Sequence, residues 1–469
     1  MKSTKKLVKL FMFLTAICLC FTFTACDFAG NSVLDIATEN GLVSSLKQPT
    51  SSTQSPQNIT NVTEHNTNVT KEVNEISLYD TYLELKEHEN YTGTFSDFLK
   101  EYLNDDTTSV DNDIEYATHK GLMSTVSIYV TFAKYYNPLL TYMGTGAGVF
   151  YSIDKTTGDA YIVTNFHVVY DKEHIASDGI STNIVCYTYG SSYGISTPIN
   201  CEYVGGSMQY DLAVLKVSGS EQLKNDDSCA TTIFDSNDIT VGETIIAVGN
   251  PEGNGLSATT GVVCVDSEHI SMPMPDNSAV VNHRVMRIDA AINAGNSGGG
   301  VYNTAGELVG IANAKIVDDM VDNIAYAIPS NVVKYVAEAI IDQCNGTTIR
   351  TIKKAIVGIT IQVIESSSYY NGQKAEIVET IKIVEITTGA LADEKLTLNA
   401  IMNKIVITDN SNPESPISTE YEIKRLFHID AMLQVKAGDT VTFYTSAENG
   451  TPLLPVTIII TNDCFTAIP

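Results

Sequence analysis

A chain of 469 residues is too long for one hydrophobic core, so two or three folded units with connecting segments are expected. Hydrophobic residues make up 43% of the chain, which is typical of a globular protein and excludes disorder throughout. The formal net charge of −27 argues against nucleic acid as a partner.

The first 25 residues have the pattern of an export signal. Four lysines precede an apolar run over residues 10–23, which is too short to span a bilayer comfortably. The run leads into a Phe-Thr-Ala-Cys string at Cys26, which resembles the signal of bacterial lipoproteins. The resemblance implies cleavage after residue 25, a lipid anchor on Cys26 and an outward-facing place at a bacterial cell membrane. A plain secretory signal is the alternative, and either implies export.

Six cysteines remain beyond Cys26, and none of them stands at CxxC or zinc-ligand spacing. They are Cys186, Cys201, Cys229, Cys264, Cys344 and Cys464. A disulfide between Cys186 and Cys201 and a set of buried free thiols both fit the sequence. No metal site or cofactor is predicted.

Two segments separate the signal from the first large domain. Residues 26–76 are predicted to be a flexible tether, because their Ser, Thr and Asn content cannot bury enough apolar surface. Residues 77–106 are predicted to form a helical hairpin, because apolar residues recur there at the spacing of one helix face. The members of that face are Phe95, Phe98, Leu99, Tyr102 and Leu103.

From residue 113 onward short β-rich runs alternate with Gly and Asn clusters, and this pattern is typical of an all-β barrel protein. The expected strands are residues 123–133, 160–164, 211–217 and 244–248. A helix over 332–344, with apolar residues on one face, would close a domain that spans 113–345.

Three segments supply the groups that acyl transfer to a hydroxyl requires: a base, a group that orients the base, and donors for the oxyanion. His167 follows an apolar strand, Asp211 stands at the start of another, and Ser297 lies in a Gly-Asn-Ser-Gly-Gly string. Each alone has an ordinary structural explanation as a core histidine, a strand cap or a loop. The chain order His, Asp, Ser is that of trypsin-like proteases.

These segments resemble the HtrA/DegP-type serine proteases over residues 115–462. The resemblance implies a mainly β protein with a trypsin-like double β-barrel, in which His167 is the general base, Asp211 orients it and Ser297 forms the acyl-enzyme. The backbone N–H groups of Gly295 and Ser297 would form the oxyanion hole. An inactive relative that keeps only the shape is the alternative. Residues 170–206 are long for this family, which predicts a surface insertion there.

The last segment, residues 352–462, resembles a PDZ domain, a small β domain that binds peptides. Val357, Gly358 and Ile359 would form its carboxylate-binding loop and edge strand, with a strand over 380–386 and a groove helix over 418–429. A generic small β domain is the alternative.

The predicted function is a serine endopeptidase that hydrolyses exported, unfolded or damaged proteins. Ala291, six residues before Ser297, would form the base of the primary substrate pocket and select small or medium apolar residues. The resemblance also implies binding of C-terminal peptides at the PDZ-like domain and is compatible with a homotrimer. The rival is a chaperone-like peptide-binding lipoprotein with little or no proteolysis. A solute-binding lipoprotein would need an α/β pattern, which the chain lacks.

Overall fold

The computed structural model describes residues 110–313, 324–347, 350–370, 372 and 374–468. The expected signal peptide, Cys26, the tether and the helical hairpin over 77–106 lie outside these ranges. Among the described helices, none has the length and apolar character needed to cross a bilayer.

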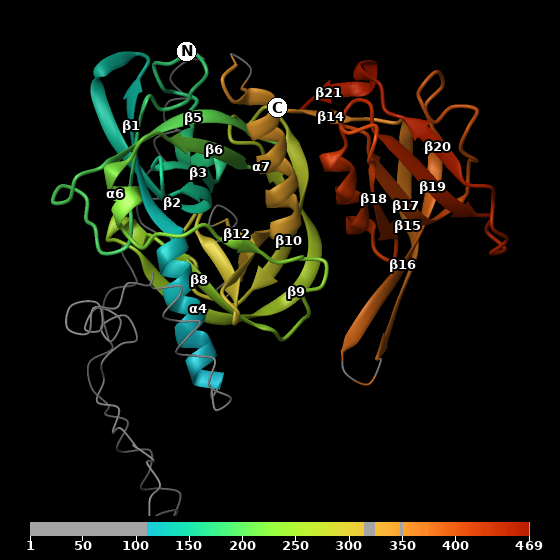
Figure 1. The fold of residues 1–469 in the computed structure, drawn as a ribbon, viewed down its shortest axis with the longest axis horizontal. Helices are drawn as coiled ribbons and strands as arrows, with labels where there is room; N and C mark the ends of the chain where they lie inside the picture. The colour runs from blue at the N-terminus through green and yellow to red at the C-terminus, as the bar shows by residue number, and fades with distance from the viewer. Residues whose placement is uncertain (1–109, 314–323, 348–349, 371, 373, 469) are drawn as a thin grey trace, which may run out of the picture. The chain divides into compact units, whose positions relative to one another are not determined.

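Six antiparallel strands form a closed barrel in the first half of the described chain (Figure 1). Their order around the barrel is β1 (Thr125–Lys134), β2 (Asn137–Asp154), β3 (Asp159–Thr164), β6 (Leu212–Val217), β5 (Ile199–Ser207) and β4 (Asn183–Tyr187). Apolar side chains from these strands, many of them Val or Ile, fill the interior, as is typical of a small barrel. Two short helices, α5 (Phe166–Val169) and α6 (Glu221–Asn225), follow β3 and β6.

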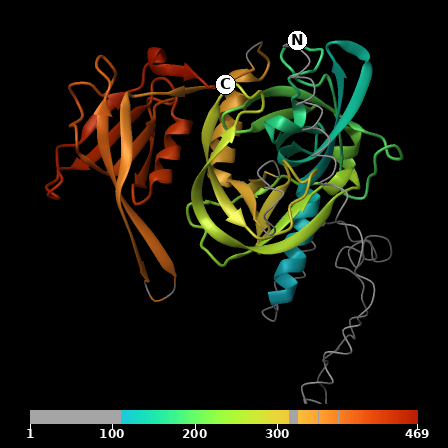
Figure 2. The ribbon, with the colours of Figure 1, turned by 180° about the vertical axis from the view of Figure 1, so that it is seen from behind.

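A second barrel follows in the chain and is seen from behind in Figure 2. Its sheet runs in the order β11 (Gly300–Asn303), β8 (Thr244–Gly249), β9 (Ser257–Pro273), β10 (Val280–Ile288), β13 (Ala325–Pro329) and β12 (Glu307–Ala312). Pairing of β11 with β12 closes these six strands, and the short β7 (Thr232–Ile233) adds to β12. A 3₁₀ turn, η1 (Pro251–Gly253), links β8 to β9. The mainly β double barrel confirms the predicted fold class.

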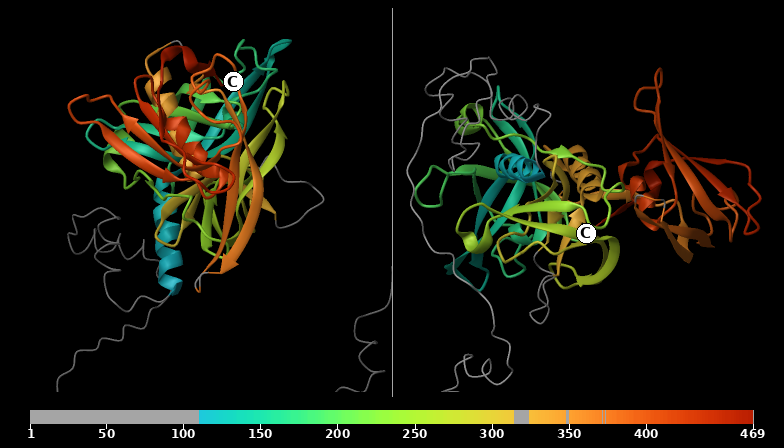
Figure 3. Two further views of the ribbon diagram at one scale, coloured as in Figure 1. Left: turned by 90° about the vertical axis from the view of Figure 1, so that its right-hand side faces the viewer. Right: turned by 90° about the horizontal axis from the view of Figure 1, so that it is seen from below.

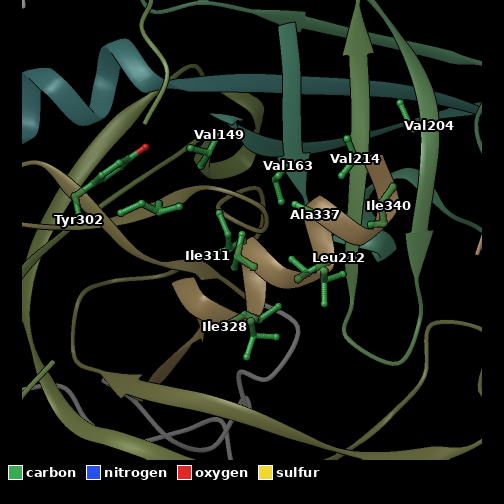
Figure 4. Packing of buried hydrophobic residues seen from close by; sticks show 14 of the residues in the cluster. Val149, Val163, Val204, Leu212, Val214, Tyr302, Ile311, Ile328, Ala337 and Ile340 are labelled. Carbon is green, nitrogen blue, oxygen red and sulfur yellow. The ribbon is translucent and has the colours of Figure 1, made fainter. Parts of the chain in front are cut away.

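Two helices flank the barrels, and both are visible in the turned views of Figure 3. Helix α4 (Val110–Ser124) packs on β8 and β11, and α7 (Ser330–Cys344) packs on β5, β6 and β12. The apolar face of α7 joins side chains from both barrels in one cluster (Figure 4), in which Ala337 and Ile340 meet Val214 and Ile311. The helix predicted over 332–344 is therefore confirmed, whereas α4 was not predicted.

The C-terminal part is a small β domain with its own core. Its main sheet has the order β15 (Ile359–Tyr370), β16 (Ala375–Ile386), β17 (Ile401–Asp409), β19 (Thr440–Ser446) and β20 (Val456–Ile459), and β18 (Ile417–Glu422) pairs with β17. A second small sheet joins β14 (Lys353–Ala355) to β21 (Phe465–Ala467), and 3₁₀ segments η3 (Leu426–Gln434) and η4 (Asn462–Cys464) complete the domain.

One sequence-based expectation is wrong in detail. The groove helix expected over 418–429 is displaced, because residues 417–422 alternate as a strand on β17 and the helical turns begin only at Leu426. Residues 170–206, where a surface insertion is expected, also contain β4 and most of β5, which the first barrel needs for closure.

All six described cysteines are free thiols in this structure. Cys186 and Cys201 are both buried in the first barrel on neighbouring strands, where β4 pairs with β5. For this pair the structure has buried thiols and no disulfide, whereas Cys229, Cys264 and Cys464 are only partly buried.

Candidate active site

His167 and Asp211 meet because of strand pairing in the first barrel. Strands β3 and β6 are antiparallel with Thr164 opposite Ala213, so the residues after β3 lie beside the residues before β6. His167 Nδ1 lies 2.7 Å from Asp211 Oδ2, and the His167 backbone N–H donates to Asp211 Oδ1 at 2.9 Å. The structure thus brings together the first two residues of the predicted triad.

Asp211 is nearly inaccessible to solvent and its backbone is fixed in an uncommon conformation. Its φ of 51° lies in the left-handed region, which costs energy for a residue other than glycine. Two hydrogen bonds to its carbonyl oxygen, from Phe166 N–H (3.1 Å) and Asn165 Nδ2 (3.0 Å), stabilise this backbone conformation. The carboxylate is therefore held in one orientation from both its backbone and its side chain.

Asn313, at the end of β12 in the second barrel, is a site residue that the sequence analysis missed. Its side chain is buried, and Nδ2 donates to Asp211 Oδ2 at 3.0 Å, the same oxygen that faces His167. A buried carboxylate needs such donors to remain charged. No sequence pattern marked Asn313, because its position depends on the pairing of β12 with β11 and β13, where Asn313 N–H donates to the Tyr326 carbonyl at 2.9 Å.

Ser297 lies in the loop between β10 and β11 and packs against the first barrel. Ala147 N–H donates to the Ser297 carbonyl at 2.8 Å. Gly298, with φ of 85°, sits so close to the turn before His167 that an added Cβ would lie 2.3 Å from Thr164 Oγ1 and 3.1 Å from Asn165 N. Only glycine fits there, which explains the glycine after the serine.

The hydroxyl of Ser297 makes no hydrogen bond to any described residue. The hydrogen bond from Ser297 Oγ to His167 is therefore not formed in this structure. The structure brings the third residue of the predicted triad to the turn that carries His167, without closing that hydrogen bond.

The backbone next to Ser297 presents two unpaired donors. Among the described residues, neither Gly295 N–H nor Ser297 N–H has an acceptor. Gly295 has φ of 96°, and the preceding carbonyl, of Ala294, is held by Glu252 N–H at 2.8 Å. The Ala294 peptide is thereby fixed, and both donors remain free to bind an oxyanion.

Ala291 is exposed, and its carbonyl accepts a hydrogen bond from Thr259 Oγ1 at 3.1 Å. The acidic side chain two residues earlier, Asp289, is engaged elsewhere, since Oδ1 accepts from Val262 N–H at 2.6 Å. A carboxylate is therefore absent at position 291, and the neighbouring one is already paired with backbone.

Val357 and Gly358 lie between β14 and β15 of the C-terminal domain, and Ile359 is the first residue of β15. Gly358 has φ of 85°, which suits a loop whose backbone N–H groups turn toward one point. They line a mainly apolar cavity of about 350 Å³ between β15 and η3. Tyr210, the residue before Asp211, lines the same cavity, and burial raises its pKa well above the ordinary value.

Among the described residues, no cluster of histidine, cysteine or acidic side chains is arranged to hold a metal ion. Cys26, the predicted lipid attachment site, lies outside the described ranges. The site is thus composed of His167, Asp211, Asn313, Ser297 and the backbone donors beside it.

The chain matches a peptidase family model and curated serine proteases. Residues 146–311 match the family model described as a trypsin-like peptidase domain. The chain is 34% identical over 309 residues to "Serine protease Do-like HtrA" of Bacillus subtilis, covering 64% of this chain and 60% of that protein. It is 36% identical over 193 residues to the protein of the same name from Lactococcus lactis subsp. lactis, covering 40% of this chain and 42% of that protein.

A solved structure described as "HtrA-type protease AlgW with tripeptide" covers 77% of this chain and 99% of that chain, with 18% identity and a TM-score of 0.46. The chain matches 60% or less of the length of these two curated relatives. The chain is thus similar to HtrA-type serine proteases and matches the trypsin-like peptidase domain over residues 146–311.

Proposed function

We propose that this chain, which is similar to HtrA-type proteases and carries a trypsin-like peptidase domain, is a serine endopeptidase with His167, Asp211 and Ser297 as its catalytic triad. The observation that carries the proposal is the 2.7 Å contact between His167 Nδ1 and Asp211 Oδ2 beside the Ser297 loop. An imidazole held in this way keeps Nε2 free to act as a base.

In the proposed reaction, His167 Nε2 takes the hydroxyl proton as Ser297 Oγ attacks the carbonyl carbon of the scissile bond. The oxyanion that forms accepts hydrogen bonds from the N–H groups of Gly295 and Ser297. His167 then gives its proton to the leaving amine, and an acyl-enzyme remains on Ser297. Water, activated by the same imidazole, hydrolyses the ester and restores the enzyme.

Asp211 stabilises the imidazolium that forms in each half of the reaction and keeps its own charge throughout. The hydrogen bond from Asn313 favours this charged form, since it adds a donor to the oxygen that faces the imidazole. Asn313 is accordingly a positioning residue, which acts through Asp211.

The proposed substrates are unfolded or damaged exported proteins. Ala291 at the base of the primary pocket favours small or medium apolar side chains before the cut, because a buried Lys or Arg would find no carboxylate there. An extended chain is required, since the peptide must reach a serine that is almost buried in its loop.

The C-terminal domain is proposed to be PDZ-like and to bind the carboxyl-terminal ends of client chains. The left-handed Gly358 supports this, together with the apolar cavity beside β15 and the free edge of that strand. Because Tyr210 lines the cavity and precedes Asp211, a bound peptide would lie near the backbone of the triad.

The proposed location is the outer face of a bacterial cell membrane, with a lipid on Cys26 as anchor. If this holds, Cys26→Ser should move the protein from the membrane fraction to the soluble fraction. Retention of that variant after a high-salt wash would place the anchor elsewhere.

The rival is a peptide-binding chaperone with little proteolysis, and one comparison separates the two. Purified protein should degrade casein, and Ser297→Ala should bind the same casein without degrading it. Equal degradation by the variant would exclude the serine mechanism, and no degradation by either protein would favour the chaperone.

A further inference from the structure

The β1–β2 hairpin extends past the barrel into a tip, drawn in teal at the top left of Figure 1 and the top right of Figure 2. The pairing register jumps between Ala133 and Lys134, where the partner residue changes from 141 to 137. Residues 138–140 therefore bulge out of the ladder beside the two-residue turn at 135–136. The tip is convex and carries more chain than a simple hairpin turn.

The side chains of this tip are apolar or aromatic and exposed. Leu139 has 93% of its surface accessible, the highest value among the large hydrophobic residues of the described chain. The others are Tyr135, Tyr136, Leu140, Tyr142 and Met143. Exposed apolar clusters of this kind mark interaction surfaces.

The tip also lacks charge. Residues 135–152 contain no Asp, Glu, Lys or Arg, although 28 basic and 55 acidic residues occur in the 469-residue chain. At that frequency a stretch of this length would hold about three charged residues. The surface is therefore apolar and uncharged within a strongly acidic protein.

The base of the hairpin is fixed by contacts with the segment after β3. Lys134 Nζ lies 3.0 Å from Asp171 and 2.8 Å from Glu173, and it stands 4.4 Å from the ring centre of Tyr142. Tyr135 N–H donates to the Glu173 carbonyl at 2.9 Å. Lys134 is thus paired with two carboxylates at the base, and the tip is held in place before it meets a partner.

We propose that this tip, defined as residues 135–143, inserts into the interfacial region of a lipid bilayer. Tyrosine side chains favour that region because their rings combine an apolar body with a polar hydroxyl, and leucine favours the acyl boundary below it. A chain with a net charge of −27 is repelled by anionic lipids, so it can reach a membrane only through apolar insertion or a lipid anchor. An uncharged tip meets that requirement.

The shape of the tip favours a bilayer over other occupants. A second copy of the chain would have to bury roughly 800 Å² per partner in a stable interface, which a convex turn and a three-residue bulge do not offer. A bilayer deforms around a narrow convex tip and needs no matching groove.

Insertion of the tip would also hold the proposed active site near the lipid surface. Strand β2 runs from the tip at Met143 to Gly146, where an added Cβ would lie 3.2 Å from the Ser297 carbonyl oxygen. The inference rests on the proposed membrane location, and it adds that the catalytic loop is held close to the lipid surface, where exported chains emerge.

The absence of tryptophan from the chain allows a direct test. Leu139→Trp would introduce the sole indole at the tip, and Leu454→Trp would place one at a similarly exposed site in the C-terminal domain as the matched control. Both are made in the full chain with Cys26→Ser and Ser297→Ala, so that neither a lipid anchor nor proteolysis contributes. Emission is recorded with and without phosphatidylcholine vesicles.

We expect the Leu139→Trp emission to shift to shorter wavelength with vesicles and to be quenched by brominated acyl chains, while Leu454→Trp stays unchanged. Adding Tyr136→Asp should abolish the shift. No shift at Leu139→Trp overturns the proposal. A shift that appears without vesicles when the protein concentration is raised would identify a second copy of the chain as the occupant. A shift that appears only when denatured casein is added would identify a client protein. Either result would overturn the proposal of bilayer insertion. Because the background is inactive, these outcomes are independent of whether the protein proves to be a protease.

Discussion

Asn313 Nδ2 donates a hydrogen bond to Asp211 Oδ2 at 3.0 Å, on the oxygen that lies 2.7 Å from His167 Nδ1. One carboxylate oxygen from the first barrel is thus shared by the proposed general base and by a residue of the second barrel. The geometry of the His167–Asp211 pair therefore depends on how the two barrels meet.

Asn313→Ala should lower kcat by about 10- to 100-fold and leave KM nearly unchanged, because it frees the Asp211 carboxylate to turn without touching the substrate. Steady-state kinetics with a peptide ester would measure both constants, and thermal unfolding would verify that the variant is folded. A rise in KM at constant kcat would instead make Asn313 a residue of substrate binding.

Ala291 should set the preference for the residue before the cut. Product mapping by mass spectrometry is expected to find cleavage after Val, Ala or Ile, since the pocket base offers no charge to a cation. Ala291→Asp should raise cleavage after Lys or Arg relative to Val. Cleavage mainly after basic residues by the unmodified protein would contradict this assignment.

The cavity beside β15 should matter for protein substrates more than for small ones. Ile361→Lys places a charge in the cavity, and Ile459→Lys, on the exposed face of β20 at the opposite edge of the sheet, is the matched control. Ile361→Lys is expected to slow casein degradation several-fold and to leave hydrolysis of a short ester unchanged. Equal losses on both substrates would mean that the domain has only a structural role.

His428 should make stability dependent on pH. Burial, followed by the nearby charges of Arg284 and Arg425, lowers the pKa of His428 to about 4. In the unfolded chain the pKa of His428 is about 6.5. Between pH 6.5 and pH 4 the unfolded state therefore binds a proton that the folded state does not bind. Stability should therefore fall as pH falls from 6.5 to 4, with a contribution on the order of 2 kcal/mol.

The comparison that isolates this contribution is urea unfolding of the unmodified protein and His428→Asn at pH 7, 5 and 4. Asparagine can still accept the N–H groups of Lys424 and Arg425, which His428 Nδ1 accepts at 3.1 and 3.0 Å. The pKa of the half-buried Asp430 is raised chiefly by desolvation, and its contribution cancels because the residue is present in both proteins. The variant should lose less stability on acidification, and parallel pH profiles would contradict the assignment.

The sequence predicted those features that depend on local pattern. Strand β3 contains the β-branched run from Ile162 to Thr164, and β6 begins with the apolar run from Leu212 to Leu215. Glycines with positive φ, such as Gly295 and Gly298, mark the loop of Ser297. Helix α4 was missed because its residues mix charged and small side chains without a strong apolar stripe.

Features that depend on contacts between distant segments were not predictable in this way. Asn313 reaches Asp211 through the pairing of β12 with its neighbouring strands β11 and β13, which no local pattern specifies. The displaced groove helix has the same origin, since pairing with β17 draws residues 417–422 into a strand.

The most direct measurement of the central claim is covalent labelling with a fluorophosphonate, which a nucleophilic serine attacks at phosphorus with loss of fluoride. Mass spectrometry of the labelled protein should locate one adduct on the peptide that contains Ser297, and His167→Ala should greatly reduce its formation. An unlabelled Ser297 in a preparation that degrades casein, or undiminished labelling in His167→Ala, would contradict the proposed triad.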